Sequence, residues 1–185
     1  ANTSQRSQDY SEIASYYRPG HADYTFDEKY GFRDYRGGGR SSGRETIGRV
    51  AAGAIAEELL KSLGIHVQAY TRSIGGIDID ETKASMDNIM KSPLYMPDLD
   101  ASEKAELLLE QKMKEQDSAG GVIECRITGT PAGLGEPVFD KLSALLAHAL
   151  MSIGAVKAVE IGDGIAVTSS NGSTDNDLSL IHISE

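Results

Sequence analysis

The sequence predicts a mixed fold in which helices and strands alternate along the chain. Apolar residues recur at helical spacing in three segments, and a short run with the composition of a β-strand follows each of them. This alternation is typical of a parallel α/β sheet or of an α+β fold with helices packed on antiparallel sheets, and the pattern alone leaves both open. With 185 residues, of which 39% are hydrophobic and 25% charged, the chain suits one globular domain.

The first regular element is expected to be a helix over residues 46–63. Its apolar residues recur three or four positions apart, and they are Ile47, Val50, Ala51, Ala54, Ile55 and Leu59. Gly64 is expected to end the helix, because glycine readily takes the left-handed conformation that follows a helix. Residues 65–74 then predict a strand, which Gly75 and Gly76 close.

The segment over residues 78–99 has no clear periodicity, because two proline turns interrupt it. After it, Asp100 and Glu103 have the spacing of a capping box. They predict the start of a second helix, which would end near Gln116.

The remaining predicted elements are two strands and the clearest helix. A strand is expected over residues 122–128, and a loop rich in glycine and proline over 129–137. A broad apolar stripe predicts the third helix, and its members are Leu142, Leu145, Leu146, Ala149, Leu150 and Ile153. A last strand is expected over residues 155–161.

The two ends of the sequence do not follow this pattern. The chain opens with Ala1 and a polar stretch without periodicity, so we expect a cut within a longer protein. Residues 168–177 are rich in Ser, Asn, Gly and Asp and are expected to be disordered. The last eight residues, Leu178–Glu185, resemble a translated sequencing adaptor, and we exclude them as a non-native tail.

Composition and charge exclude several classes of protein. No apolar run approaches the roughly 20 residues that cross a bilayer. The single cysteine, Cys125, excludes an internal disulfide and is compatible with a reducing cytoplasm. The net charge of −10 argues against a general nucleic-acid binder. Residues 1–49 nevertheless carry eight Lys and Arg against seven Asp and Glu, whereas residues 50–185 carry ten against twenty-one.

Arginines gather in one short stretch of this amino-terminal part. Five of the nine lie between positions 33 and 49, namely Arg33, Arg36, Arg40, Arg44 and Arg49. An acidic protein that concentrates guanidinium groups in this way is expected to bind a small anion there. The alternative is a set of surface ion pairs with Asp34 and Glu45, and charge alone does not decide between the two.

The same stretch contains a glycine loop directly before the first predicted helix. Residues 37–39 are glycines, whose N–H groups can approach a ligand closely because no Cβ atom intervenes. Ser42 and Glu45 fit a capping box, which would direct the free N–H groups of the helix toward this loop. Arg40 and Arg44 flank the helix end and can make bidentate contacts to phosphate or carboxylate. The segment predicts an anion site, although an RNA-binding Arg-Gly box and simple helix punctuation are alternatives.

His21 is the histidine nearest to this stretch. It lies in a Pro-Gly turn, where a group that titrates near neutral pH can donate a proton, although a lone loop histidine is more often structural or simply exposed. His66 and His148 are expected to be structural, and Cys125 is expected to be a core residue of the strand over residues 122–128. No residues have the spacing of metal ligands, and neither the P-loop nor the dinucleotide glycine spacing is present.

Several long motifs occur in a characteristic order. The two central ones are Arg18-Pro-Gly-His-Ala-Asp23 and Arg36-Gly-Gly-Gly-Arg-Ser-Ser-Gly-Arg-Glu-Thr46. Later ones are Asp117-Ser-Ala-Gly-Gly121, Pro131-Ala-Gly-Leu-Gly-Glu-Pro-Val-Phe-Asp-Lys-Leu142 and Gly162-Asp-Gly164. In this order they resemble the chorismate synthase family. The resemblance covers residues 2–177, so residues 1–177 are expected to be the central part of a single domain. Gly43 departs from it by replacing the usual alanine.

The resemblance implies an α+β fold with a helical core between antiparallel sheets, incomplete in this chain, and a cytoplasmic homotetramer. It implies a lyase that removes phosphate from 5-enolpyruvylshikimate 3-phosphate by 1,4-anti elimination, giving chorismate in the shikimate pathway of aromatic amino acid biosynthesis. The reaction needs reduced FMN without a net redox change, and NADPH would take part only indirectly, as a reductant. The only partners implied are this phosphorylated small molecule and copies of the same chain, with no nucleic acid, membrane or metal.

The matching motifs also imply roles for particular residues. His21 corresponds to the proton donor beside the reduced flavin, and Arg44 to an arginine of the substrate and flavin pocket. Arg40, Ser41 and Ser42 match the element that contacts FMN, and Ser42 can also relay a proton.

Parts of the family pattern are missing from the sequence. The Gly-Glu-Ser-His-Gly segment, which supplies a second catalytic histidine, does not occur, and neither do the segments that complete the FMN pocket. We therefore expect the chain by itself to be inactive and to bind FMN weakly. The competing interpretation is a non-catalytic module for anion binding or oligomerisation.

Overall fold

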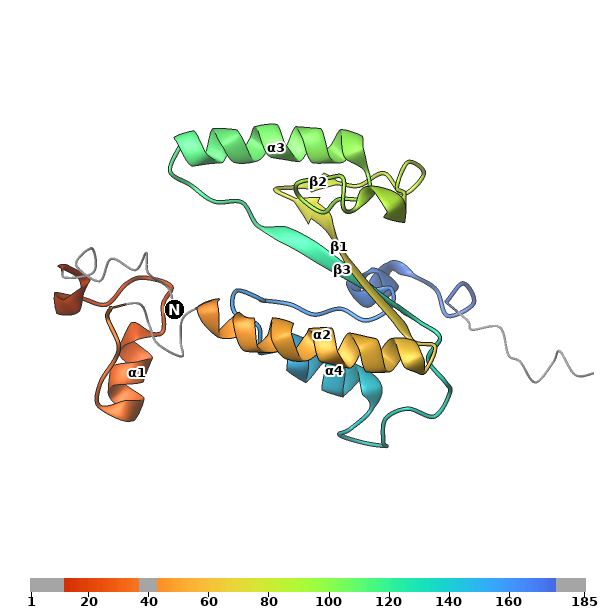
Figure 1. Ribbon diagram of the computed structural model, residues 1–185, viewed down its shortest axis with the longest axis horizontal. Helices are drawn as coiled ribbons and strands as arrows, with labels where there is room; N and C mark the ends of the chain where they lie inside the picture. Colours follow the sequence, from red (N-terminus) through yellow and green to blue (C-terminus); the bar gives the residue numbers. More distant parts are fainter. Residues whose placement is uncertain (1–11, 37–42, 176–185) are drawn as a thin grey trace, which may run out of the picture. The chain divides into compact units, whose positions relative to one another are not determined.

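The computed structural model describes residues 12–36 and 43–175 of the chain (Figure 1). Its α-helices are α1 (Asp23–Tyr30), α2 (Thr46–Ser62), α3 (Leu99–Lys114) and α4 (Leu142–Met151). Its strands are β1 (His66–Ile74), β2 (Ile77–Asp78) and β3 (Gly121–Thr128). Short 3₁₀ helices occur at Glu12–Ser15, Gly43–Glu45, Met86–Asn88 and Gly164–Ser169. The chain divides into two compact units, one drawn from residues 1–51 and 132–185 and the other from residues 52–131.

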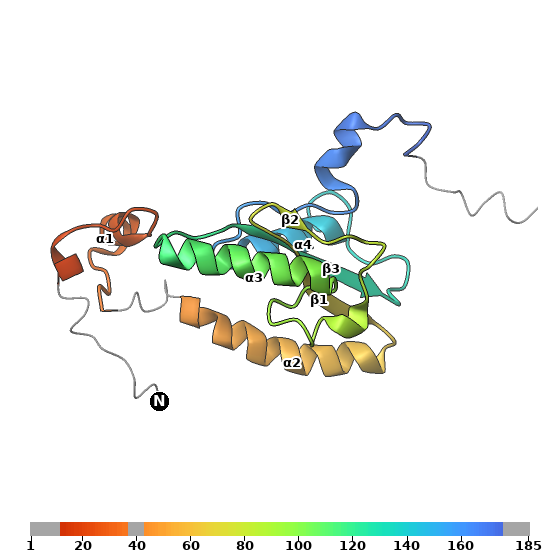
Figure 2. The ribbon, with the colours of Figure 1, turned by 90° about the horizontal axis from the view of Figure 1, so that it is seen from above.

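The strands form one antiparallel sheet with the order β2-β1-β3 (Figure 2). β1 and β3 pair along their whole length, from His66 opposite Thr128 to Ile74 opposite Gly121, with one irregularity between Thr71 and Ser73. The tight turn from β1 into β2 uses Gly75 and Gly76, both at positive φ, as the glycine pair predicts. Because the pairing is antiparallel, it decides between the two classes that the sequence left open, and the predicted α+β class is confirmed.

Helix α2 begins at Thr46 and ends at Ser62, close to the predicted bounds. Gly64 follows it at a φ of 76°, so its role in ending the helix is confirmed. The predicted cap residue Ser42 lies outside the described residues. The apolar stripe of α2 has the predicted spacing but is exposed, with Ile47 at 70% and Ile55 at 76% of their full accessibility.

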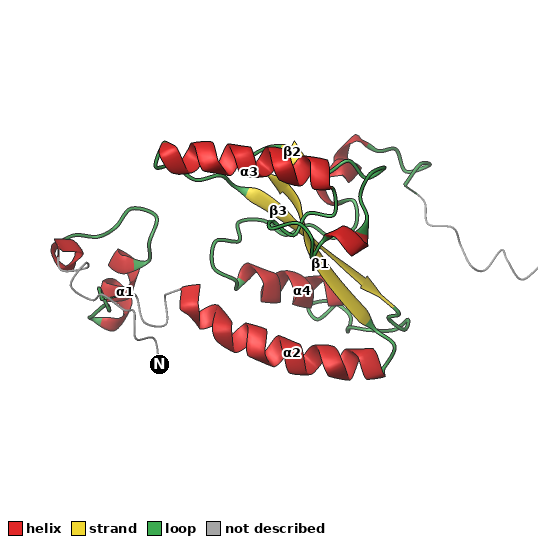
Figure 3. Ribbon diagram, turned by 45° about the horizontal axis from the view of Figure 1, so that its top comes forward, coloured by secondary structure: helices red, strands yellow, loops and turns green. Residues whose placement is uncertain are grey.

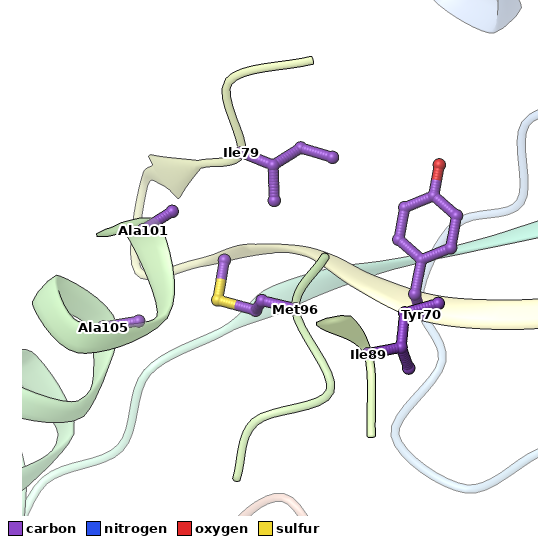
Figure 4. Packing of buried hydrophobic residues seen from close by; sticks show 6 residues of the cluster. All are labelled: Tyr70, Ile79, Ile89, Met96, Ala101 and Ala105. Carbon is purple, nitrogen blue, oxygen red and sulfur yellow. The ribbon is translucent and has the colours of Figure 1, made fainter. Parts of the chain in front are cut away.

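The core of the second unit lies between the sheet and α3 (Figure 4). Its buried members are Tyr70, Ile79, Ile89, Met96, Ala101 and Ala105. Figure 4 shows the Met96 side chain between the two alanines of α3 and the side chains of Ile89 and Tyr70. The segment 78–99, which had no clear periodicity, therefore supplies a large part of this core as an irregular loop.

Polar side chains fix the path of this loop where it enters the core. The buried Ser92 hydroxyl accepts the backbone N–H groups of Leu94 and Met96, each at 3.1 Å. It also shares a hydrogen bond of 2.7 Å with the buried Ser102 hydroxyl of α3. These bonds satisfy backbone groups that an irregular buried segment would otherwise leave without partners.

A carboxylate on β3 organises one face of the sheet. Glu124 accepts hydrogen bonds from the Tyr70 hydroxyl at 2.5 Å, from Arg72 at 2.6 Å and from Arg126 at 2.8 Å. Burial alone would raise the pKa of Glu124, but these hydrogen bonds lower it to about 2. Burial, together with the hydrogen bond to Glu124, raises the pKa of Tyr70 to about 12. The buried tyrosine hydroxyl thus has an ionised partner across the β1–β3 pair.

The prediction that Asp100 caps α3 is wrong. The N-cap is Asp98, whose Oδ1 accepts the backbone N–H groups of Asp100 at 3.0 Å and Ala101 at 3.3 Å. Its Oδ2 accepts the N–H of Asp80 at 2.9 Å, so one buried carboxylate joins the helix start to the loop after β2. Asp100 itself is exposed and pairs with Lys83 at 2.8 Å.

Replacing Asp98 with alanine is expected to lower the free energy of unfolding by about 2 kcal/mol, because the cap and the Asp80 contact are lost together. The matched control is Asp100→Ala, which removes only an exposed ion pair and is expected to cost less than about 1 kcal/mol. Urea unfolding followed by circular dichroism measures both. Equal effects of the two substitutions would contradict the assignment of the cap.

Two further predictions need correction. Residues 155–161 do not form a strand: Val156 closes a turn by donating to the Ile153 oxygen at 3.3 Å, and Ala155 has a φ of 70°. A strand also needs a partner, and none pairs with this segment in the described part of the chain. Cys125 is exposed rather than in the core.

The remaining predicted segments fall partly within the described residues. The third helix ends at Met151, two residues before the predicted end. Within the segment expected to be disordered, Thr174 donates to the Asn171 oxygen at 2.9 Å and closes a turn, while residues 176–185 lie outside the described ranges. Among the described residues, no helix combines the length and apolar character needed to span a membrane.

Candidate functional site

His21 lies in the tight turn that leads into α1. Figure 3 shows α1 as a short helix. Gly20 precedes it at a φ of 71°, a conformation that favours glycine. The backbone N–H of His21 closes the turn on the Arg18 oxygen at 3.3 Å. Its ring Nδ1 lies 3.0 Å from the Pro19 oxygen, and because a carbonyl oxygen only accepts, Nδ1 carries the hydrogen in this bond. The ring is exposed. Because Nδ1 is hydrogen-bonded to Pro19, Nε2 is the ring nitrogen that can exchange a proton with a ligand.

Asp23 anchors this turn from the first position of α1. The buried carboxylate accepts two hydrogen bonds from the Arg18 guanidinium, at 2.8 and 2.9 Å, and a third from the Arg18 backbone N–H at 3.1 Å. Arg33 forms a second ion pair with it, with Nη1 3.0 Å from Oδ2. The hydrogen bonds from Arg18 hold the pKa of Asp23 well below its usual range. The turn that carries His21 is thus held by two arginines, Arg18 and Arg33, which both pair with Asp23.

The arginine cluster is largely occupied by ion pairs. Arg33 pairs with Asp23, donates to the backbone oxygens of Ala14 and Tyr16, and stacks over the Tyr17 ring with its guanidinium carbon 5.0 Å from the ring centre. These contacts make Arg33 part of the scaffold that holds the turn rather than a group directed at a ligand.

The ion-pair alternative raised from the sequence is confirmed for two arginines. Arg36 pairs with Asp34, whose carboxylate also accepts the Arg36 backbone N–H at 3.0 Å. Arg49 pairs with Glu45 and donates to the backbone oxygen and the hydroxyl of Ser152, each at 3.2 Å. Both arginines are therefore held by carboxylates of this cluster.

The amino end of α2 carries positive charge that suits an anionic ligand. Arg44 is exposed in the short 3₁₀ helix that leads directly into α2, and the positive end of the helix dipole lies here. The acidic residue at this end, Glu45, is neutralised by Arg49 and so repels an anion less. The Thr46 hydroxyl donates to the Gly43 oxygen at 2.6 Å and holds the junction.

Part of the predicted site lies outside the described residues, namely the three glycines with Arg40, Ser41 and Ser42. The described contacts include none between His21 and Arg44, although both belong to the same unit. That His21 faces Arg40 and Ser42 therefore stays a prediction. In the described part of the chain, no group of His, Cys, Asp and Glu side chains could hold a metal ion.

Sequence reasoning missed the anchoring role of Asp23 and Arg18. Both belong to the motif that contains His21, and their spacing across a Pro-Gly turn was the available signal. An aspartate at the first turn of a helix, five residues after an arginine, can close a bidentate pair across that turn.

Comparison with known proteins gives consistent matches. A family model described as chorismate synthase matches residues 1–184. The chorismate synthase of Lachnoclostridium phytofermentans is 68% identical over 177 residues, covering 96% of this chain and 48% of that protein. The chorismate synthase of Agathobacter rectalis is 63% identical over 176 residues, covering 95% of this chain and 48% of that protein.

A solved structure agrees with these matches. A crystal structure of chorismate synthase superimposes with a TM-score of 0.76 at 30% identity, covering 85% of this chain and 52% of that chain. The present chain spans about half the length of the curated relatives it matches.

Proposed function

The chain belongs to the chorismate synthase family, and we propose that, in a protein of its relatives' length, it takes part in the elimination of phosphate from 5-enolpyruvylshikimate 3-phosphate to give chorismate. In this 1,4-anti elimination a ring C–H bond breaks, its hydrogen is lost as a proton, and its electron pair goes into the new diene, which has one more ring double bond than the substrate. The C–O bond to phosphate breaks, and phosphate leaves with the electron pair of that bond. The observation that carries the proposal is the clamped turn that presents the exposed His21 ring within the family's motif.

His21 is the proposed proton donor beside the reduced flavin. In the imidazolium both ring nitrogens carry hydrogen, and Nδ1 stays with the Pro19 oxygen, so the transferable proton is on Nε2. The Arg18–Asp23 pair fixes the turn, and the ring is held without being buried. A positioned acid of this kind lowers the barrier only if its geometry is maintained through the reaction.

The amino end of α2 is the proposed anion cradle. Arg44, with Arg40, Ser41 and Ser42, would hold FMN and the substrate, which together carry phosphate and carboxylate groups. The charges of the described residues suit an anionic ligand. Arg44 lies at the amino end of α2, and the carboxylate at that end, Glu45, is already paired with Arg49. Reduced FMN, when bound, supplies the reduced flavin that the elimination needs without a net redox change. Ser42 would relay a proton, and NADPH would enter only as a reductant of the flavin.

The proposal also covers the oligomeric state and the location of the full-length enzyme, and the activity of this chain alone. We propose a cytoplasmic homotetramer of full-length chains, with the small phosphorylated substrate as its ligand. The 185-residue chain alone is proposed to be inactive and to bind FMN weakly. Its length, about half that of the relatives, is what supports this part of the proposal.

A chimera tests the function. We expect the Lachnoclostridium phytofermentans chorismate synthase to retain phosphate release, with reduced FMN present, when its matching 177 residues are replaced by those of this chain. The 185-residue chain assayed alongside is expected to release none. Loss of activity in a folded chimera would contradict the lyase proposal, and turnover by the chain alone would contradict its inactivity.

A further inference from the structure

Arg49, in the first turn of α2, is held by contacts from two helices that lie far apart in the sequence. One of its guanidinium nitrogens, Nη1, pairs with the carboxylate of Glu45, which directly precedes α2. The other, Nη2, donates to the backbone oxygen and to the hydroxyl of Ser152, each at 3.2 Å. Ser152 follows Met151, the last residue of α4, so one side chain joins the start of α2 to the end of α4.

The contacts at Ser152 fix the direction of the Arg49 guanidinium. The Ser152 hydroxyl donates its hydrogen to the Ala149 oxygen at 2.6 Å, so its lone pairs are available to accept from Arg49. The Ser152 carbonyl lies at the carboxyl end of α4, where the helix dipole is negative and favours a cation. Both Nη atoms of Arg49 therefore have acceptors within this chain, an arrangement that suits a supporting group rather than one directed at a ligand.

The Glu45 carboxylate needs such a partner because of where it lies. Glu45 ends the short 3₁₀ helix that leads into α2, at the positive end of the helix dipole. A carboxylate that turned toward this end would compete with an anionic ligand for the positive charge and would also repel the ligand. Arg49 lies four residues further on, one turn away from the helix start, so the ion pair draws the carboxylate along the helix instead.

We propose that Arg49 is a positioning residue of the anion cradle at the amino end of α2. It holds the Glu45 carboxylate away from the ligand and anchors the start of α2 on Ser152. The inference rests on the proposed function, because it concerns the affinity of the same cradle for FMN and for the phosphorylated substrate. Arg49 acts through Glu45 and makes no contact with the reacting atoms, so its effect falls on ligand affinity and not on the chemical step.

A double-mutant cycle in the chimera tests this role. Arg49→Gln is expected to raise the dissociation constant of reduced FMN and the KM of the substrate by about two- to fivefold, the range of an exposed ion pair, with kcat little changed. In a Glu45→Gln background the same substitution releases no carboxylate, and the factor by which it weakens binding is expected to be smaller by about twofold or more. Anaerobic titration followed by flavin absorbance measures the dissociation constant, and phosphate release gives KM and kcat.

The matched control is Lys61→Gln, on the same helix. Lys61 pairs with Glu57 at 2.8 Å, and the two are also four residues apart, but Lys61 lies about 18 Å further along α2 than Arg49. The substitution removes the same charge at a distance beyond the Debye length of about 8 Å at physiological ionic strength. It is therefore expected to leave the affinity for reduced FMN unchanged.

Three results would overturn the positioning role of Arg49. They are an unchanged affinity for reduced FMN in Arg49→Gln, an equal loss in both Glu45 backgrounds, and an equal loss in Lys61→Gln. An equal loss in both backgrounds would mean that Arg49 acts on the ligand directly or only through the fold, which circular dichroism checks. The lyase proposal fails by a separate result, the absence of phosphate release by the parent chimera, and the flavin titration still decides on Arg49 in that case.

Discussion

Replacing His21 with alanine in the active chimera is expected to lower kcat by about 10²–10⁴-fold, the contribution of a positioned general acid. Proton transfer takes place only in the transition state, so the affinity for reduced FMN and the KM for the substrate are expected to change little. The free energy of unfolding should also stay within about 0.5 kcal/mol, because the ring is exposed and its hydrogen bond is local, to Pro19. Stopped-flow measurement of phosphate release and urea unfolding check the two parts separately.

The matched control for this substitution is His66→Ala. His66 is also exposed, and it lies at the start of β1, far along the chain from the proposed cradle. It is expected to leave kcat unchanged. If the two variants retain the same kcat, His21 is not the proton donor.

Local signals were sufficient for most of the secondary structure. The start of α2, the glycine that ends it and the strand β1 follow from spacing and from residues that have one strong conformational preference. The N-cap residue of α3 could not be predicted from local sequence, because Asp98 and Asp100 are both aspartates near the helix start and either could cap it. Asp98 takes the role since its second oxygen is held by the Asp80 N–H, a contact made across 18 positions of the chain.

Errors arose where a structure depends on a partner. Residues 155–161 have a composition suitable for a strand, yet no strand of the described chain pairs with them. Cys125 lies in a strand as predicted, but alternation along the strand does not tell which face another layer covers. The antiparallel pairing itself was likewise beyond local pattern, because the same alternation of helix and strand suits a parallel sheet.

At the candidate site, the charge count overstated the number of arginines directed at a ligand. Arg33, Arg36 and Arg49 each pair with a carboxylate, and the sequence contains no local signal that separates these from Arg44. The resemblance to the family singled out Arg40 and Arg44 as the arginines of the ligand pocket. The roles of Arg40, Ser41 and Ser42 stay predictions, since these residues lie outside the described ranges.

Asp23→Asn is expected to release the turn that carries His21. Asparagine keeps the shape but not the charge, so Arg18 and Arg33 lose the carboxylate that pairs with both. Removing one partner from a buried ion pair is strongly destabilising, and because Arg18 is partly exposed we expect a local loss of about 2–3 kcal/mol. Hydrogen exchange of the α1 amides, Asp23–Tyr30, should accelerate accordingly, and kcat of the chimera should fall although His21 is intact.

The pH dependence of hydrogen exchange in α1 distinguishes the role of the Asp23 carboxylate from a general effect on folding. The native pKa of Asp23 is lowered, so its stabilising contribution is complete above the unfolded pKa near 4. The contribution is lost progressively as the pH falls from there through the lower native pKa. Protection of the α1 amides in the parent chain should therefore be retained between pH 7 and about 4 and fall below that range, whereas the Asp23→Asn variant should lack this acid transition. Asp27→Asn is the control, because its carboxylate lies 3.5 Å from Arg33, is more exposed and is expected to contribute less than about 1 kcal/mol. If α1 exchanges at the same rate in the Asp23 and Asp27 variants, the turn is held by other contacts, and the positioning of His21 would need another explanation.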